Sequence, residues 1–280
     1  MVVIGGGTAG LEAACTAAEV GCNTFLLEKG NELGGLASLI SKIPAKNRLA
    51  DFPHYLMHRA EQLDNLYIFK NTEGTPENIR KFHPNIIVSS TGSAPLLPPI
   101  AGLKDRIDNE NHNIYSILGM ISHINDFPKD LEGKKVVVVG GGAVGLDVVE
   151  FFADRNADIS IVEMMDQIGR DLDPVSKNDT KTMMKKHNVH QLTKTALLEV
   201  KDSSFLVRGD GEPYELPFEY GFVCLGMRAQ GQLYQSLTEE FSSEDVEIMN
   251  IGDSQRARRI IDGTQEGRNI LTVLEQKGYL

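Results

Sequence analysis

Met1-Val2-Val3-Ile4-Gly5-Gly6-Gly7-Thr8-Ala9-Gly10 is the stretch that decides the fold. A short apolar run leads into Gly5-x-Gly7-x-x-Gly10, a helix-like stretch of small residues follows, and a second apolar run ends at Glu28. This order of strand, glycine turn, helix, strand and acid is typical of a dinucleotide-binding unit. The glycines permit a tight turn, close approach to a pyrophosphate, and close packing of helix on strand. The helix N-terminus attracts phosphate, and the acid accepts hydrogen bonds from a ribose.

The same pattern occurs a second time along the chain. The apolar run Val136–Val139 leads into Gly140-x-Gly142-x-x-Gly145, and a helix-like stretch and another apolar run follow. In both copies the acid lies 18 residues after the third glycine, at Glu28 and at Glu163. The repeat therefore predicts two nucleotide sites on an α/β fold with two Rossmann-like domains. The alternative is the same pair of folds with empty glycine loops.

Composition excludes several classes of function. The chain has 280 residues and a net charge of −11, so nucleic acid and anionic membranes are not expected partners. No apolar run approaches the roughly 18 residues of a membrane span. The first residues form a core strand without a basic leader, so we expect a cytoplasmic protein.

Cysteine usage excludes other chemistry. Cys15, Cys22 and Cys224 are the only cysteines, and no two of them have the spacing of a metal-binding or redox pair. We expect all three to fill the core in a reducing compartment, without a disulfide, a zinc site or an iron–sulfur cluster in this chain. No acid/base dyad or nucleophile is recognisable, so we expect neither a catalytic side chain nor a metal ligand.

The remaining pattern outlines the other elements. Gly34-Gly35 suggests a second close approach of backbone to a ligand. A buried strand at 86–90 leads into Thr91-Gly92, and a similar strand ends at Gly226. The polar stretch 104–113 is expected to cross into the second domain. Helices are predicted over 52–63, 76–82, 174–187 and 260–277, and antiparallel strands over 197–200 and 205–208.

Together these motifs resemble one family of flavoproteins. Two glycine fingerprints, Thr91-Gly92 and a late Ile251-Gly252-Asp253 resemble flavoproteins with two dinucleotide-binding domains. The closer resemblance is to the C-terminal part of the NADH:flavin oxidoreductase group, which includes 2,4-dienoyl-CoA reductase, 2-enoate reductase and trimethylamine dehydrogenase. The short motifs that carry it are Leu33-Gly34-Gly35-Leu36, Lys42-Ile43-Pro44-Ala45-Lys46, Asn71-Thr72-Glu73, Thr75-Pro76-Glu77 and Ser90-Thr91-Gly92-Ser93.

The resemblance implies an NAD(H) domain, residues 108–245, inserted into an FAD domain formed by residues 1–107 and 246–280. It implies that hydride passes from NADH to FAD. The residues implied at FAD are Gly5, Gly7, Thr8, Ala9, Gly10, Glu28, Lys29, Gly35, Leu36, Arg48, Thr91, Gly92, Gly252 and Asp253. Those implied at NAD(H) are Gly140, Gly142, Ala143, Val144, Gly145, Glu163 and Gly226. Arg48 is expected along the pyrophosphate and ribityl chain, and Asp253 at the ribityl or pyrophosphate region.

The sequence departs from this group in one large respect. The group carries an N-terminal barrel with FMN and a cysteine-ligated iron–sulfur cluster, which this chain lacks, so we expect a part of a larger reductase with that barrel as its partner. Residues 36–40 also lack the cysteine pair that disulfide reductases of this fold place after the glycine pair. Two interpretations remain open: an NADH-to-FAD module that supplies electrons to the missing domain, and a non-catalytic domain that holds ADP, as in trimethylamine dehydrogenase.

Overall fold

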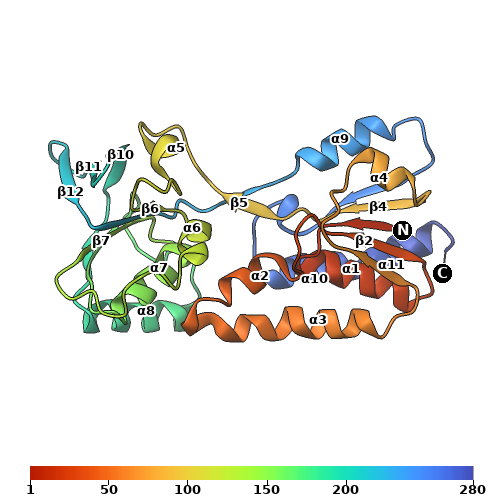
Figure 1. The fold of residues 1–280 in the computed structure, drawn as a ribbon, viewed down its shortest axis with the longest axis horizontal. Coiled ribbons are helices and arrows are strands. Elements are labelled where there is room, and N and C mark those ends of the chain that lie inside the picture. The colour runs from red at the N-terminus through yellow and green to blue at the C-terminus, as the bar shows by residue number, and fades with distance from the viewer. Residues whose placement is uncertain (280) are drawn as a thin grey trace. The chain divides into compact units, whose positions relative to one another are not determined.

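The computed structural model describes residues 1–279, which form two compact units (Figure 1). Unit 1 consists of residues 1–42, 46–94 and the segment from 228 onward, and unit 2 consists of residues 43–45 and 95–227. The second unit is thus inserted into the first, and each contains a parallel sheet with helices. The predicted α/β class, with two Rossmann-like domains and one inserted in the other, is confirmed.

The unit boundaries lie earlier in the chain than the expected boundaries at 107/108 and 245/246. Leu103 and Ile107 belong to the buried core of unit 2, so the polar stretch that follows is the surface of that unit and not a linker. Leu237 and Phe241, at the end of α9 (Gln232–Glu240), belong to the core of unit 1. Apolar burial therefore sets both boundaries, and polarity along the sequence does not.

The sheet of unit 1 has the order β15-β4-β1-β2-β3, and all its pairings are parallel. Its strands are β1 (Val2–Ile4), β2 (Thr24–Leu27), β3 (Leu66–Phe69), β4 (Ile86–Ser89) and β15 (Glu247–Asn250). Side chains alternate between the faces: Val3 joins one buried cluster, and its neighbours Val2 and Ile4 join another. The apolar runs of the sequence are continuous because both faces of the sheet are covered.

Helices cover both faces of this sheet (Figure 1). One face carries α1 (Thr8–Glu19), α3 (Asp51–Glu61), α10 (Ile260–Arg268) and α11 (Ile270–Gln276). The other carries α4 (Pro76–Arg80) and α9. Shorter elements are α2 (Gly35–Ile40) and the 3-10 turns η1 (Pro44–Ala50) and η2 (Gly252–Ser254).

Unit 2 repeats this arrangement with the order β6-β13-β7-β8-β9, again all parallel. Its strands are β6 (Ile114–Tyr115), β7 (Lys135–Val139), β8 (Asp158–Val162), β9 (His190–Leu192) and β13 (Tyr220–Val223). Its helices are α5 (Leu103–Arg106), α6 (Ile117–Ser122), α7 (Ala143–Ala153) and α8 (Pro174–Lys186). An antiparallel sheet contains β10 (Ala196–Val200), β11 (Ser204–Arg208) and β12 (Tyr214–Pro217). Where the chain passes between units, β5 (Ser93–Pro95) pairs with β14 (Met227–Ala229).

Local signals predicted some elements better than others. The hydroxyl of Thr75 accepts a hydrogen bond from the N–H of Asn78 at 3.3 Å, which confirms the predicted cap of α4. The single helix predicted over 260–277 is wrong, because the chain turns at Asn269 and continues as α11. That turn lets Ile270 and Leu274 enter the core of unit 1.

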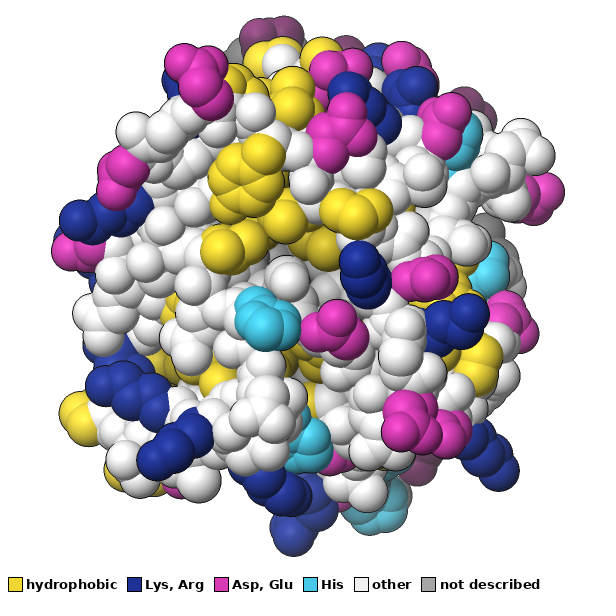
Figure 2. All heavy atoms as spheres, turned by 90° about the vertical axis from the view of Figure 1, so that its left-hand side faces the viewer, with side chains coloured by type: hydrophobic (Ala, Val, Ile, Leu, Met, Phe, Trp, Pro, Cys, Tyr) yellow, Lys and Arg dark blue, Asp and Glu magenta, His cyan; other side chains and the backbone are white. Residues whose placement is uncertain are grey.

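The surface is mixed in charge on the face at the left of Figure 1, where basic and acidic side chains are interspersed around a group of hydrophobic ones (Figure 2). Among residues 1–279, no helix is long and apolar enough to cross a membrane.

Candidate dinucleotide sites

The carboxyl edge of each parallel sheet gathers the predicted motifs. In unit 1, the first glycine loop follows β1, Glu28 follows β2, Thr91-Gly92 follows β4, and Gly252-Asp253 follows β15. Strands that run the same way end at the same edge, so motifs more than two hundred residues apart come together there. The loop after β1 lies where the strand order reverses, which is where open α/β sheets bind ligands.

The first glycine loop is shaped by contacts that exclude side chains. Gly5 has a φ of +102°, and a Cβ on Gly10 would lie 2.0 Å from the carbonyl oxygen of Gly5. A Cβ on Gly7 would instead meet nothing closer than the Cα of Gly35, at 4.0 Å. No side chain caps the start of α1 and its first turn has no acid, so its N–H groups face that open space. A pyrophosphate fits this position by size and by charge.

Glu28 lies against the same loop. Its two carboxylate oxygens each accept one backbone N–H at 2.7 Å, from Gly6 and from Gly30. The carboxylate is therefore fixed at the end of β2 and keeps lone pairs for a ribose diol. Lys29, the next residue, is exposed.

The loop of unit 2 has the same geometry. Gly140 has a φ of +108°, and a Cβ on Gly145 would lie 1.9 Å from its carbonyl oxygen. A Cβ on Gly142 would meet nothing within 4 Å. Glu163 accepts N–H groups at 2.7 Å from Gly141 and Met165. Ala143 and Val144 form the first turn of α7, which also has no side-chain cap. The second site thus repeats the open phosphate position and the fixed carboxylate of the first.

The glycine pair after Glu28 packs on the first loop. The N–H of Gly34 donates to the carbonyl of Gly6 at 2.8 Å, and a Cβ on Gly35 would lie 3.0 Å from the Cα of Gly7. Leu36, in the first turn of α2, is half-buried. Arg48 lies on η1 with its side chain 89% exposed, and its Nε donates to Asp51 at 2.8 Å. The structure thus brings the glycine pair to the loop and places Arg48 on the surface of η1.

The segments after β4 and β15 are joined by side chains. Thr91 donates its hydroxyl to the carbonyl of Gln230 at 2.7 Å. Ser93 donates to Oδ2 of Asp253 at 3.0 Å. Gly92 has a φ of +74° and open space at its Cβ position. Gly226, with a φ of +99°, has the same open space in unit 2.

Sequence reasoning missed residues that support these motifs. Ser90 donates its hydroxyl to the carbonyls of Ile4 and Gly5, at 2.8 and 3.0 Å. Gly267 of α10 packs so closely on α1 that a Cβ would lie 2.6 Å from the carbonyl oxygen of Ala9. Glu266 accepts the N–H of Gly252 at 2.7 Å. The spacing of Gly263 and Gly267 in α10 is the one sequence pattern that indicates this close helix packing. No sequence motif indicates the hydrogen bonds of Ser90 and Glu266.

Two of the three cysteines are poor candidates for chemistry at these sites. Cys15 and Cys224 are buried, and burial raises the pKa of their thiols to about 11 and about 12. Both therefore stay protonated near neutral pH and are poor nucleophiles. Within residues 1–279, no group of three or more histidine, cysteine, aspartate or glutamate side chains could hold a metal ion.

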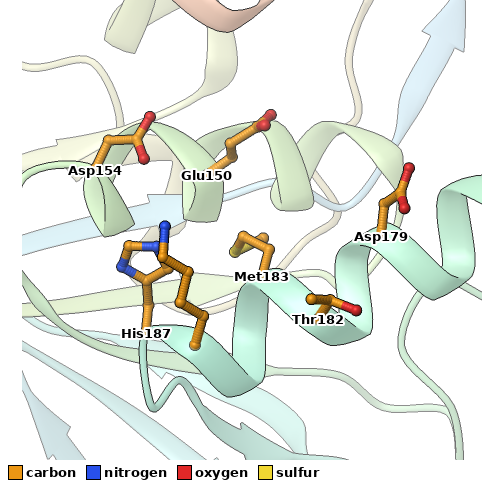
Figure 3. A pocket seen from close by; sticks show the side chains of 7 residues that line it. Glu150, Asp154, Asp179, Thr182, Met183 and His187 are labelled. Carbon is orange, nitrogen blue, oxygen red and sulfur yellow. The ribbon is translucent and has the colours of Figure 1, made fainter.

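One surface hollow of about 370 Å³ lies between α7 and α8 of unit 2 (Figure 3). The side chains that line it are Glu150, Asp154, Asp179, Thr182, Met183, Lys186 and His187. None of them belongs to a glycine motif. The geometry that fits a dinucleotide is therefore at the sheet edges and not in this hollow.

Two parallel α/β units, each with a glycine loop and a fixed carboxylate, define the class of proteins with two dinucleotide-binding domains. Residues 1–249 match the family described as pyridine nucleotide-disulphide oxidoreductase. The chain belongs to this family. Membership makes it an oxidoreductase domain and implies FAD and NAD(P)H as its cofactors, which the open loops fit.

Individual relatives are larger than this chain. It is 28% identical to the NADH oxidase of Thermoanaerobacter brockii over 268 residues, which cover 95% of this chain and 40% of that protein. It is 27% identical to the metal reductase of Desulforamulus reducens over 305 residues, 96% of this chain and 43% of the other. The solved complex of 2-naphthoyl-CoA reductase with 2-naphthoyl-CoA is similar in fold, with a TM-score of 0.81 at 23% identity over 96% of this chain and 39% of the other.

These relatives confirm the resemblance found in the sequence. The chain is homologous to the FAD- and NAD-binding part of NADH oxidase- and reductase-type flavoproteins. It spans about 40% of the length of the relatives that it matches.

Proposed function

We propose that this chain passes a hydride from NADH, held in unit 2, to FAD, held in unit 1, and that a partner domain with FMN and an iron–sulfur cluster then receives the electrons. That partner would reduce an enoate or enoyl-type substrate. One observation carries the proposal: two glycine loops of the same geometry, each with its own fixed carboxylate, in a chain of this family. A non-catalytic nucleotide-binding domain would need only the first of them.

Each residue set has a defined task in this proposal. The loop at Gly7 and the start of α1 would bind the FAD pyrophosphate, and Glu28 would hold its adenosine ribose. The loop at Gly142 and Glu163 would do the same for NADH. When bound, FAD supplies the two-electron carrier that amino acid side chains lack. The protein contributes binding and orientation, which agrees with the lack of an acid/base dyad.

A dithiol in this chain is not the electron acceptor that we propose. Disulfide reductases of this fold need a cysteine pair after the glycine pair, and residues 36–42 contain none. The buried thiols of Cys15 and Cys224 are not substitutes, since burial keeps both protonated. The electrons must therefore leave through a group outside this chain, as the greater length of the relatives suggests.

The spectrum of the purified protein tests this proposal. We expect yellow flavin absorbance, FAD released on denaturation, and bleaching of the flavin by NADH under anaerobic conditions. With ferricyanide as acceptor the chain should oxidise NADH, whereas it should not reduce an enoate without its partner. A colourless protein that takes up ADP but no FAD would favour the non-catalytic alternative. Robust reduction of an enoate by this chain alone would refute the need for a partner domain.

A further inference from the structure

Two carboxylates, those of Asp253 and Glu266, hold the loop between η2 and α10. Asp253 accepts the N–H of Arg258 on Oδ1 and the hydroxyl of Ser93 on Oδ2, both at 3.0 Å. Glu266, near the end of α10, accepts the N–H of Gly252 at 2.7 Å on Oε2 and pairs with the Arg258 guanidinium at 2.5 Å on Oε1. One network of hydrogen bonds and an ion pair thus joins Gly252, Asp253, Arg258 and Glu266.

Glu266 is the member of this network that sequence motifs do not explain. It is 14 residues from Gly252, and no helix or turn requires an acid there. Its side chain is only 24% exposed, although glutamate is ordinarily well exposed. Gly252 itself is buried, so its N–H would be unpaired without this carboxylate. Glu266 therefore determines where the chain turns immediately before Asp253.

Ser93 fixes the other side of Asp253. It is 8% exposed and lies directly after Thr91-Gly92, so it ties the segment after β4 to the segment after β15. With Arg258 on the other oxygen, the Asp253 carboxylate cannot rotate freely. An acid held by two neutral donors keeps lone pairs on each oxygen for hydroxyl groups of a ligand.

We propose that Glu266 is a positioning residue of the first nucleotide site, which acts through Asp253 and whose effect is confined to the flavin half of FAD. This inference rests on the proposed function, in which unit 1 binds FAD. Glu266 and Ser93 preorganise Asp253 to accept hydrogen bonds from the ribityl hydroxyls. ADP has the pyrophosphate and the adenosine but no ribityl chain, so its binding depends on Gly7 and Glu28 and not on Glu266.

The test compares FAD and ADP affinities of Glu266→Ala by equilibrium titration. Loss of the preorganised hydrogen bonds should weaken FAD binding about tenfold to a hundredfold and leave ADP binding unchanged. Glu266→Gln should recover most of the FAD affinity, because its amide oxygen still accepts the N–H of Gly252. As a matched control, Glu215→Ala removes a unit 2 carboxylate that also has two partners, Lys201 and Ser204, and should change neither affinity.

A double-mutant cycle shows whether the effect passes through Asp253. In an Asp253→Ala background, Glu266→Ala should cause no further loss of FAD affinity. Equal weakening of FAD and ADP, or full additivity with Asp253→Ala, would show that Glu266 only stabilises unit 1 and would overturn the inference. If the Ala variant does not fold, Glu266→Met, which keeps the length of the side chain but cannot accept the N–H of Gly252, replaces it in the same two backgrounds and should likewise weaken FAD binding and not ADP binding. A wild-type chain that binds no FAD would instead refute the proposed function itself.

Discussion

NADH should be preferred over NADPH if Glu163 lies, as we propose, at the adenosine ribose where NADPH carries its extra phosphate. Glu163 is the acid that follows β8, and its oxygens each accept a backbone N–H at 2.7 Å, from Gly141 and Met165. These two contacts hold the carboxylate against the glycine loop, so it cannot rotate away from an approaching anion. The same oxygens can accept both hydroxyls of an unmodified adenosine ribose.

The size of the preference follows from Coulomb's law. Two like charges about 4 Å apart repel by about 1 kcal/mol in water and by about 4 kcal/mol near a protein surface. That range corresponds to about one to three orders of magnitude in affinity. A cation beside the Glu163 carboxylate would reduce this repulsion. Arg170 is close in sequence, and the structure adds Lys194, whose N–H donates to the carbonyl of Met165 at 2.9 Å. Both side chains are exposed, so solvent weakens any compensation.

Anaerobic stopped-flow reduction of the bound flavin measures this preference as a ratio of efficiencies for the two nucleotides. Glu163→Gln removes the charge and should lower the ratio of NADH efficiency to NADPH efficiency by about tenfold or more. Glu28→Gln is the matched control, since Glu28 also accepts two backbone N–H groups, from Gly6 and Gly30 of unit 1. It should weaken FAD retention and leave the ratio unchanged. Equal efficiency in the wild type, or NADPH preference that survives both Arg170→Ala and Lys194→Ala, would show that Glu163 is not at the ribose.

Three further predictions follow from single positions. Gly7→Val should abolish FAD binding with little change in melting temperature, because its side chain fills open space. Gly10→Ala should instead destabilise unit 1, because its Cβ meets the backbone of Gly5. Differential scanning fluorimetry with and without FAD distinguishes the two effects. Glu12→Ala should lower the free energy of unfolding in urea by about 3 kcal/mol, since it removes a carboxylate only 3% exposed and leaves the guanidinium of Arg59, itself 13% exposed, partly uncompensated. Burial raises the pKa of the Cys224 thiol in the folded protein to about 12. The thiol therefore stabilises the folded state fully below an ordinary thiol pKa of about 8.5, and this stabilisation is lost as the pH rises toward 12. A free energy of unfolding that stays flat over that range in the wild type, or that falls equally in Cys224→Ala, would contradict this.

Local sequence signals are sufficient for the glycine loops. The apolar runs, the three glycines and the acid 18 residues later are all within one continuous segment in each unit. Their physical requirements, a φ above +100° at Gly5 and Gly140 and no room for a Cβ at Gly10 and Gly145, act between near neighbours. The class of fold can therefore be predicted from these two segments alone.

Long-range contacts cannot be predicted in the same way. The hydrogen bond between Ser93 and Asp253 joins residues 160 apart, and the sequence contains no sign of that pairing. The break at Asn269 carries neither glycine nor proline and arises because α10 packs on α1 while α11 packs into the core. Such features depend on tertiary packing, which overrides local propensity.

The insertion of unit 2 between β4 and β15 reverses the order in which the two sheets can be completed during synthesis. These strands are neighbours in one sheet, yet residues 95–227 separate them along the chain. All five strands of the unit 2 sheet are therefore available before β15 has left the ribosome. Unit 1 must wait for β15 and for Gly252 and Gly267, which pack against Ala9. The first glycine loop is thus translated before unit 2, but we expect it to become competent for nucleotide only after the sheet of unit 2 is complete.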